Sequence, residues 1–184
     1  MASAAAPLVG VLALQGDFEA HGVLLRSLGA QVREIRVPAD LDGIDALVLP
    51  GGESTTMTLG VAREELAQPL REACARMPVL GTCAGMIMLD RDHLGVLDMR
   101  CERNAFGRQI RSFEGDVALD GFAEPFHGVF IRAPWVAEHG PDVEVLGAVG
   151  GHPIAVASGR TVAVAFHPEL IGEPRLHRRL LEAV

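Results

Sequence analysis

The sequence lacks the features that mark membrane and secreted proteins. None of its apolar runs approaches the roughly 20 residues that are needed to cross a bilayer. Residues 1–7, MASAAAP, contain no basic segment and no long apolar segment, so they do not predict a signal peptide, and we expect them to be disordered. The chain has only three cysteines, and their spacing predicts neither a disulfide framework nor a zinc site. We therefore expect a cytoplasmic protein in a reducing compartment.

Positive charge is also scarce. The chain has 16 lysines and arginines against 24 aspartates and glutamates, which gives a net charge of −8. A nucleic-acid binder would need a basic face, so this composition argues against that class of function. Repeats, low-complexity tracts and obvious linkers are absent as well. With 184 residues, of which 49% are hydrophobic, the chain fits a single folded domain over residues 1–184.

Apolar runs alternate with helical patterns along the first half of the chain. Residues 8–14, LVGVLAL, form a continuous apolar run, which is typical of a strand buried on both faces of a parallel sheet. Shorter segments in the second half look antiparallel and hairpin-like. We predict helices over 18–28, between the loop 50–56 and residue 76, and over 175–184, and strands over 8–14, 32–37, 46–49, 77–80, 109–119, 128–132, 143–146, 154–157 and 161–166. This order predicts an α/β three-layer sandwich, in which helices flank a mixed, mostly parallel sheet.

A cysteine stands between small residues in the segment 81–85, GTCAG, with apolar runs on both sides. This pattern predicts a strand, a sharp turn that the glycines permit, and a helix. Backbone N–H groups at the start of a helix stabilise a thiolate. The alternative is that a lone cysteine among small residues is a buried, inert hydrophobe. Cys74 and Cys101 fit that alternative, whereas the glycine-flanked turn favours Cys83 as a nucleophile.

A histidine and a glutamate lie two residues apart near the C-terminus, after the strand-like run 161–166. In extended backbone, residues i and i+2 point the same way, so the carboxylate of Glu169 can orient the imidazole of His167. With Cys83 they make up a nucleophile, a base and an orienting group, which predicts a cysteine hydrolase. The meeting of Cys83 and His167 in space is an inference, because the sequence does not show it.

The pair Gly51-Gly52 follows the buried run 46–49 and is expected at the carboxyl edge of the sheet, where ligands bind in open α/β sheets. Because no side chain intervenes, the N–H groups there can approach a ligand closely. Together with the N–H of Ala84 they could hold the oxyanion of a tetrahedral intermediate. The alternative is a simple tight turn. The position after a buried strand, combined with the cysteine turn, favours the oxyanion role.

Two arginines are candidates for binding an anionic group of a substrate. Arg103 stands before a predicted strand and Arg132 at the end of another. A guanidinium can grip a carboxylate through two parallel hydrogen bonds. By chemistry alone, either arginine could equally be a solvated surface charge.

The other histidines lack the spacing of metal ligands and are expected at the surface or in core positions where they are hydrogen-bonded. They are His21, His93, His127, His139, His152 and His177.

Six short segments, spread from about Val9 to the C-terminal helix, carry the most specific patterns of the chain. They are 12–17 (LALQGD), 49–57 (LPGGESTTM), 81–86 (GTCAGM), 103–109 (RNAFGRQ), 129–134 (VFIRAP) and 166–170 (FHPEL). Together they resemble the glutaminase subunits of pyridoxal 5'-phosphate synthase. The cysteine turn and the His-Pro-Glu segment are shared by class I glutamine amidotransferases generally, so the resemblance implies that fold. The segments 50–56, 103–109 and 130–134 are more specific to the one family.

The resemblance implies a concrete chemistry. Cys83 would attack the side-chain amide of L-glutamine, with His167 as base and then acid and Glu169 orienting it. Ammonia would leave, and water would hydrolyse the glutamyl thioester to glutamate. The resemblance also implies that the oxyanion is held by Gly52 and Ala84 and that no metal or organic cofactor is needed. The residues implied to line the glutamine site are Gly51, Gly52, Glu53, Arg103, Ile131 and Arg132.

The resemblance further implies a protein partner. The ammonia would pass to a barrel-shaped synthase subunit, which builds pyridoxal 5'-phosphate from ribose 5-phosphate and glyceraldehyde 3-phosphate. Family members are weakly active alone, so docking to that subunit is expected to activate the chain. We also expect the Gly51-Gly52 peptide to act as an activity gate, because a glycine-flanked peptide can flip with little steric penalty.

The chain departs from the family pattern in two places. The connector 90–98 is shorter than usual, which means either a trimmed loop or missing residues. Residues 171–174, IGEP, replace a more polar stretch. Two other functions stay open: a glutaminase subunit that serves a different amidotransferase, and a non-catalytic regulatory protein on the same fold. The intact set of Cys83, His167 and Glu169 argues against the second.

Overall fold

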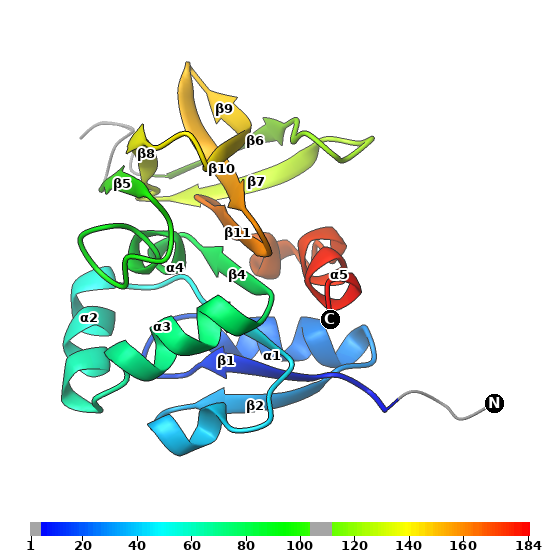
Figure 1. Cartoon of the computed structure of the whole chain (residues 1–184). Helices are drawn as coiled ribbons and strands as arrows, with labels where there is room; N and C mark the ends of the chain where they lie inside the picture. The colour runs from blue at the N-terminus through cyan, green and yellow to red at the C-terminus, as the bar shows by residue number, and fades with distance from the viewer. Residues whose placement is uncertain (1–4, 104–111) are drawn as a thin grey trace.

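The centre of the fold is a mixed sheet of seven strands, in a computed structural model that describes residues 5–103 and 112–184 (Figure 1). The strand order is β2-β1-β3-β4-β11-β10-β9. The first five of these strands pair in parallel, and β10 pairs antiparallel with both β11 and β9. The strands are β1 (Leu8–Leu12), β2 (Gln31–Ile35), β3 (Ala46–Leu49), β4 (Val79–Thr82), β9 (Glu144–Val149), β10 (His152–Ser158) and β11 (Thr161–Val164). The predicted α/β class with a mostly parallel sheet is confirmed.

Helices cover both faces of this sheet (Figure 1). The connections β1-α1-β2 and β3-α2-α3-β4 run across the sheet in opposite directions. Because such crossovers are right-handed, α1 lies on one face and α2 and α3 lie on the other. α5 lies beside α1, where ring nitrogens of His21 and His177 are 2.8 Å apart. The helices are α1 (Phe18–Ser27), α2 (Ser54–Arg63), α3 (Ala67–Arg76), α4 (Ala84–Met88) and α5 (Arg175–Glu182), with 3₁₀ turns η1 (Pro38–Leu41) and η2 (Pro168–Ile171).

The central strands are apolar because both of their faces are covered. All four residues of β3, of β4 and of β11 are buried. This explains why the sequence shows continuous apolar runs there in place of the alternation of a half-exposed strand. The first strand is shorter than predicted and ends at Leu12, and β2 begins one residue earlier than the predicted 32–37.

Two small antiparallel sheets lie beside the main sheet in the described part of the chain (Figure 1). One pairs β5 (Met99–Glu102) with β8 (Trp135–His139), and the other pairs β6 (Ser112–Val117) with β7 (Phe126–Ile131). The sequence analysis predicted hairpin-like strands in this region but missed β5 and β8, which are short and largely exposed. The rings of Phe126 and Phe130 contact that of Phe166, with centroids 6.0 and 5.6 Å away, and join β7 to the core.

Residues 1–4 of the segment expected to be disordered lie outside the described residues, and the Pro7 carbonyl accepts a hydrogen bond from the Gln31 N–H at 2.9 Å. Among the described residues, no helix is long and apolar enough to cross a membrane.

Parallel pairing brings four loops to one edge of the sheet. β1, β3, β4 and β11 all end there, so the segments 13–17, 50–53, 83–85 and 165–169 lie close together. Glycines allow this close approach. A Cβ at Gly85 would lie 1.9 Å from the carbonyl oxygen of Leu49, and a Cβ at Gly51 would lie 2.2 Å from the His167 ring.

Gly85→Ala is therefore expected to destabilise the protein, because the added methyl group would overlap the backbone of β3. We expect the free energy of unfolding to fall by about 3 kcal/mol, the upper range for overpacked positions. Gly115→Ala in β6 is the control, since a Cβ there has no heavy atom within 4 Å, and we expect a change of at most about 0.5 kcal/mol. Urea unfolding of both variants measures the difference, and similar midpoints would contradict the steric argument.

Candidate active site

Cys83 sits in a strained turn between β4 and α4. Its backbone has φ 47° and ψ −106°, which few residues other than glycine adopt. The turn is fixed by a hydrogen bond of 2.8 Å from the Cys83 N–H to the Val164 carbonyl. This local structure is the strand, sharp turn and helix that the glycines around Cys83 predicted. The Sγ atom lies 3.9 Å from the carbonyl oxygen of Ile131 and is nearly buried.

His167 and Glu169 face each other directly behind this turn. His167 Nδ1 lies 2.6 Å from Glu169 Oε1, and both side chains are buried. The backbone that achieves this is not the extended one assumed from the sequence. β11 already ends at Val164, and Pro168 starts the 3₁₀ turn η2, which places Glu169 against the ring.

The protonation of His167 is set by opposing effects. Burial alone would lower its pKa, but hydrogen bonds to Cys83 and Glu169, together with the negative charge of both partners, raise the pKa to about 10. At neutral pH the ring is therefore an imidazolium that stands between a sulfur and a carboxylate. Such a cation beside Sγ stabilises the thiolate that attacks carbonyl groups.

The two other cysteines lie in a different environment. Burial raises the pKa of the Cys74 thiol to about 12 and also raises the pKa of Cys101. Neither thiol ionises at neutral pH, which agrees with the interpretation of both as packing residues.

Backbone N–H groups of two segments are free to bind an anion beside Cys83. Among the described residues, neither the Gly52 N–H nor the Ala84 N–H has a hydrogen-bond partner. The carbonyl of Gly51 points towards the 15–17 loop and accepts a hydrogen bond of 3.1 Å from the Asp17 N–H. Because the peptide is trans, the Gly52 N–H points the opposite way.

A pocket of about 420 Å³, partly open to solvent, adjoins the sulfur of Cys83. It brings together residues that the sequence analysis named as separate candidates, and its wall includes Ser54 and Ile87, which that analysis missed. Ile87 is apolar and follows the pattern of a core residue, and Ser54 was missed because a serine after Glu53 reads equally well as the start of a helix. Gly51 and His167 lie behind this lining rather than on it. The wall consists of Gly52, Glu53, Ser54, Cys83, Ala84, Ile87, Arg103, Ile131 and Arg132.

The charged residues of the pocket are held in different ways. Glu53 caps α2: its carboxylate accepts hydrogen bonds from the N–H groups of Thr55 and Thr56 at 3.0 and 2.7 Å, and these bonds lower its pKa to about 2. Arg103 donates hydrogen bonds to the hydroxyl groups of Ser54 and Thr55 at 3.3 and 3.0 Å. Arg132 has φ 46°, another left-handed backbone position at the pocket. The rest of the segment 103–109 lies outside the described residues.

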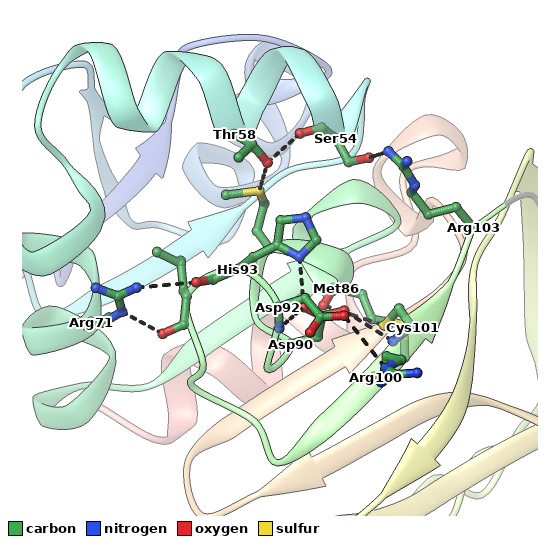
Figure 2. A network of polar contacts seen from close by, with 12 residues as sticks. Ser54, Thr58, Arg71, Met86, Asp90, Asp92, His93, Arg100, Cys101 and Arg103 are labelled. Atoms are coloured by element: carbon green, nitrogen blue, oxygen red, sulfur yellow. Dashed lines mark hydrogen bonds and ion pairs between the residues drawn. The ribbon is translucent and has the colours of Figure 1, made fainter.

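The short connector 90–98 is bonded to Cys101, two residues before Arg103 (Figure 2). Asp90 is almost fully buried, and its carboxylate accepts hydrogen bonds from the N–H of Asp92 at 3.0 Å, the His93 ring at 2.7 Å and the N–H of Cys101 at 3.1 Å. The last bond ties the connector to β5, the strand that leads into Arg103. The connector is therefore a turn that is closed by its own hydrogen bonds.

One group of side chains has the composition of a metal site. The ligand atoms of Asp17, His167 and Glu169 all lie within 4.8 Å of one another. However, His167 Nδ1 is already engaged by Glu169 at 2.6 Å, and Asp17 Oδ2 lies further away, at 3.6 Å. An imidazolium has no lone pair for a metal, so this group is better suited to orienting a base.

Cys83→Ala is expected to lower the pKa of His167 from about 10 towards its ordinary value. The substitution removes a hydrogen bond and a negative charge that both favour the protonated ring, while burial still opposes protonation. At a pH between the two values the wild-type ring keeps its proton and the ring of the variant loses it. An NMR titration of the His167 ring measures both curves. Superimposable curves would contradict the pairing of sulfur and imidazolium.

Comparisons with known proteins agree with this geometry. Residues 11–184 match the model of the SNO glutamine amidotransferase family. The chain is 51% identical to "Pyridoxal 5'-phosphate synthase subunit PdxT" of Mycolicibacterium vanbaalenii, over 94% of this chain and 95% of the relative. It is 50% identical to the protein of the same name of Mycobacteroides abscessus, over 97% of both chains.

Solved structures share the fold of this chain. A crystal structure described as a glutamine amidotransferase superposes with a TM-score of 0.89 at 45% identity and covers 95% of this chain and 97% of its own. The structure of PurLQS from Thermotoga maritima, at 19% identity and a TM-score of 0.73, covers 96% of this chain and 98% of its own and shares the fold. On these grounds the chain belongs to the SNO glutamine amidotransferase family.

Proposed function

We propose that this chain is the glutaminase subunit of a pyridoxal 5'-phosphate synthase. It hydrolyses L-glutamine to L-glutamate and ammonia, and the ammonia passes to a synthase subunit. The observation that carries the chemistry is the buried series of Cys83, His167 and Glu169 next to a pocket with two arginines. The family and the names of the relatives at about half identity support the biosynthetic role.

The reaction begins from the charged pair of sulfur and imidazolium. The Cys83 thiolate attacks the side-chain carbonyl carbon of glutamine, and the N–H groups of Gly52 and Ala84 hold the oxygen that becomes negative. His167 then gives its proton to the amide nitrogen, so that ammonia leaves and a thioester forms. The neutral ring next takes a proton from water, and the resulting hydroxide attacks the thioester. Collapse of this second intermediate releases glutamate and restores the thiolate.

The substrate is held by charge at the far side of the pocket. Arg103 and Arg132 supply guanidinium groups for the α-carboxylate of glutamine, in keeping with the strength of charge-assisted hydrogen bonds. The carboxylate of Glu53 stays ionised and fixed by the start of α2, so it provides a negative group for the α-amino group. Ile131 contributes the apolar wall and the carbonyl beside the sulfur.

Control by a partner is expected to act on the Gly51-Gly52 peptide. The contact from the Asp17 N–H to the Gly51 carbonyl holds this peptide in one orientation. Rotation of the peptide would exchange its N–H for its C=O at the pocket, and the glycines make that rotation sterically cheap. This structure has the competent orientation, with the Gly51 carbonyl on the 15–17 loop. We expect the flipped peptide to prevail in the free chain in solution, and docking of the barrel-shaped synthase subunit to shift the population to the competent orientation.

Glutamate release by the purified chain, alone and mixed with a synthase subunit, tests this function. We expect hydrolysis to rise at least about tenfold on mixing, which corresponds to a shift of about 1.4 kcal/mol in the population of the competent state. Cys83→Ala is expected to abolish hydrolysis in both samples, since Cys83 carries the only thiol of the pocket wall among the described residues and the Ser54 hydroxyl is bound by Arg103 instead of by a base. Near-normal hydrolysis by this variant would refute the nucleophile, and equal rates with and without the subunit would refute the gate.

Asp90→Asn is expected to raise the KM for glutamine several-fold with a smaller effect on kcat. The amide offers one acceptor oxygen where the carboxylate uses two, and its NH₂ group would face a donor, so β5 and Arg103 lose their fixed position. Asp92→Asn is the control, because that side chain is 63% exposed and its ion pair with Arg100 is long, at 3.6 Å. Saturation curves for both variants decide the point, and equal KM values would exclude a role of Asp90 in holding Arg103.

A further inference from the structure

A second group of buried polar side chains lies behind the catalytic residues. His21 comes from α1, His177 from α5 and Thr82 from the end of β4, and all three side chains are fully buried. Polar side chains in such positions are costly unless they are hydrogen-bonded. None of the three takes part in the proposed reaction, so their burial needs another reason.

Short contacts connect these residues into one series. His21 Nδ1 lies 2.8 Å from His177 Nε2, and His21 Nε2 lies 3.1 Å from the Thr82 hydroxyl oxygen. The same Nε2 atom is 3.4 Å from Glu169 Oε2. Thr82 directly precedes Cys83, so the series runs from the C-terminal helix to the catalytic turn.

The carboxylate of Glu169 is incompletely satisfied without this series. One oxygen, Oε1, contacts His167, whereas Oε2 is buried and makes no hydrogen bond of good geometry with any described residue. His21 Nε2 is the ring nitrogen that faces it, at a distance that a small movement would convert into a hydrogen bond. Catalytic hydrogen bonds are often long in the absence of substrate and tighten when it binds.

The protonation of His21 decides what it offers to that oxygen. Burial, together with the nearby His177 and His167 rings, keeps the pKa of His21 well below its ordinary value, so the ring is neutral and carries one hydrogen. If the hydrogen is on Nδ1, a lone pair of Nε2 faces the carboxylate. If it is on Nε2, an N–H faces both the Thr82 hydroxyl and the carboxylate.

The second arrangement is favoured by the charge of Glu169. Burial also holds the pKa of His177 down, at about 4, so His177 is neutral as well and can donate its Nε2–H to His21 Nδ1. The opposite arrangement would instead let His177 Nδ1–H face the backbone carbonyl of Glu173, to which this atom makes no hydrogen bond of good geometry. Hydrogen bonds to an ionised group are roughly twice as strong as those between neutral groups, so the interaction with the carboxylate prevails.

We propose that His21 is a positioning residue of this site: its Nε2–H faces the second oxygen of Glu169 and fixes the carboxylate that orients His167. His177 holds His21 in the required tautomer. The carboxylate then keeps one orientation while His167 loses and regains its proton during the reaction. This role rests on the proposed glutaminase function, but the tautomer it requires does not.

The tautomer is tested on the unmodified full chain by NMR of the ¹⁵N-labelled histidine rings. The His21 signals are assigned from their disappearance in the His21→Gln variant. We expect Nε2 of His21 to carry the hydrogen and Nδ1 to be bare. A hydrogen on Nδ1 would overturn the proposal, whatever the activity of the protein.

Two substitutions of different length test the effect on the reaction, measured as glutamate release in the presence of the synthase subunit. In His21→Gln the amide nitrogen reaches the place of Nε2, so we expect kcat within about threefold of wild type. In His21→Asn the shorter amide reaches only the place of Nδ1, which faces His177, and leaves Glu169 Oε2 without a donor. We expect kcat to fall roughly 10- to 100-fold with KM within about twofold.

Leu24→Ala, in the same helix, is the control for lost packing. It removes a mostly buried side chain without a hydrogen-bond donor, so we expect a lower melting temperature with an unchanged kcat. Equal kcat values for the Gln and Asn variants would overturn the positioning role. Absence of glutamate release by the wild-type protein would instead refute the proposed function and leave the tautomer measurement as the test of His21.

Discussion

The contact of 2.6 Å between His167 Nδ1 and Glu169 Oε1 is the interaction on which the site depends. Burial by itself would drive the proton off His167, and the negative partners on its two sides reverse that effect. This requires that two strands end at the same level. β11 pairs in parallel with β4, with Val164 beside Thr82, so the residues that follow each strand emerge together. The chemistry thus follows from the register of two buried strands.

Much of this arrangement could be predicted because it produces recognisable patterns in the sequence. A strand covered on both faces reads as an unbroken apolar run, as in 46–49 and 161–166, and parallel strands force their carboxyl ends to one edge. The cysteine between glycines and the His-Pro-Glu segment both follow such runs. For the same reason the pocket wall contains the residues that the family resemblance implied for the glutamine site, with the exception of Gly51. The roles of those residues stay predictions.

The rest could not be predicted because it depends on contacts between distant segments. Within residues 5–103 and 112–184, the short strands β5 and β8 pair only with each other and are largely exposed, so neither carries an apolar signature of its own. Asp90 looks like a surface aspartate in sequence, yet it is buried and accepts a hydrogen bond from the N–H of Cys101, 11 positions away. His21 and His177 are separated by 156 positions and meet only because α1 and α5 pack on the same face. The turn η2 also replaced the extended backbone assumed between His167 and Glu169.

The strain at Cys83 shows how the fold and the chemistry constrain each other. A left-handed backbone at a residue other than glycine costs on the order of 1–3 kcal/mol. It persists because the turn is fixed from both ends: the Cys83 N–H is bound to Val164, and Gly85 lies against the carbonyl of Leu49, where a Cβ would come within 1.9 Å. The small residues beside Cys83 are thus required by the packing of α4 against β3, and the strained turn directs the sulfur to the imidazolium and the pocket. A glycine at position 83 would relieve the strain but would remove the nucleophile, so the surrounding sheet must supply the stability that this position lacks.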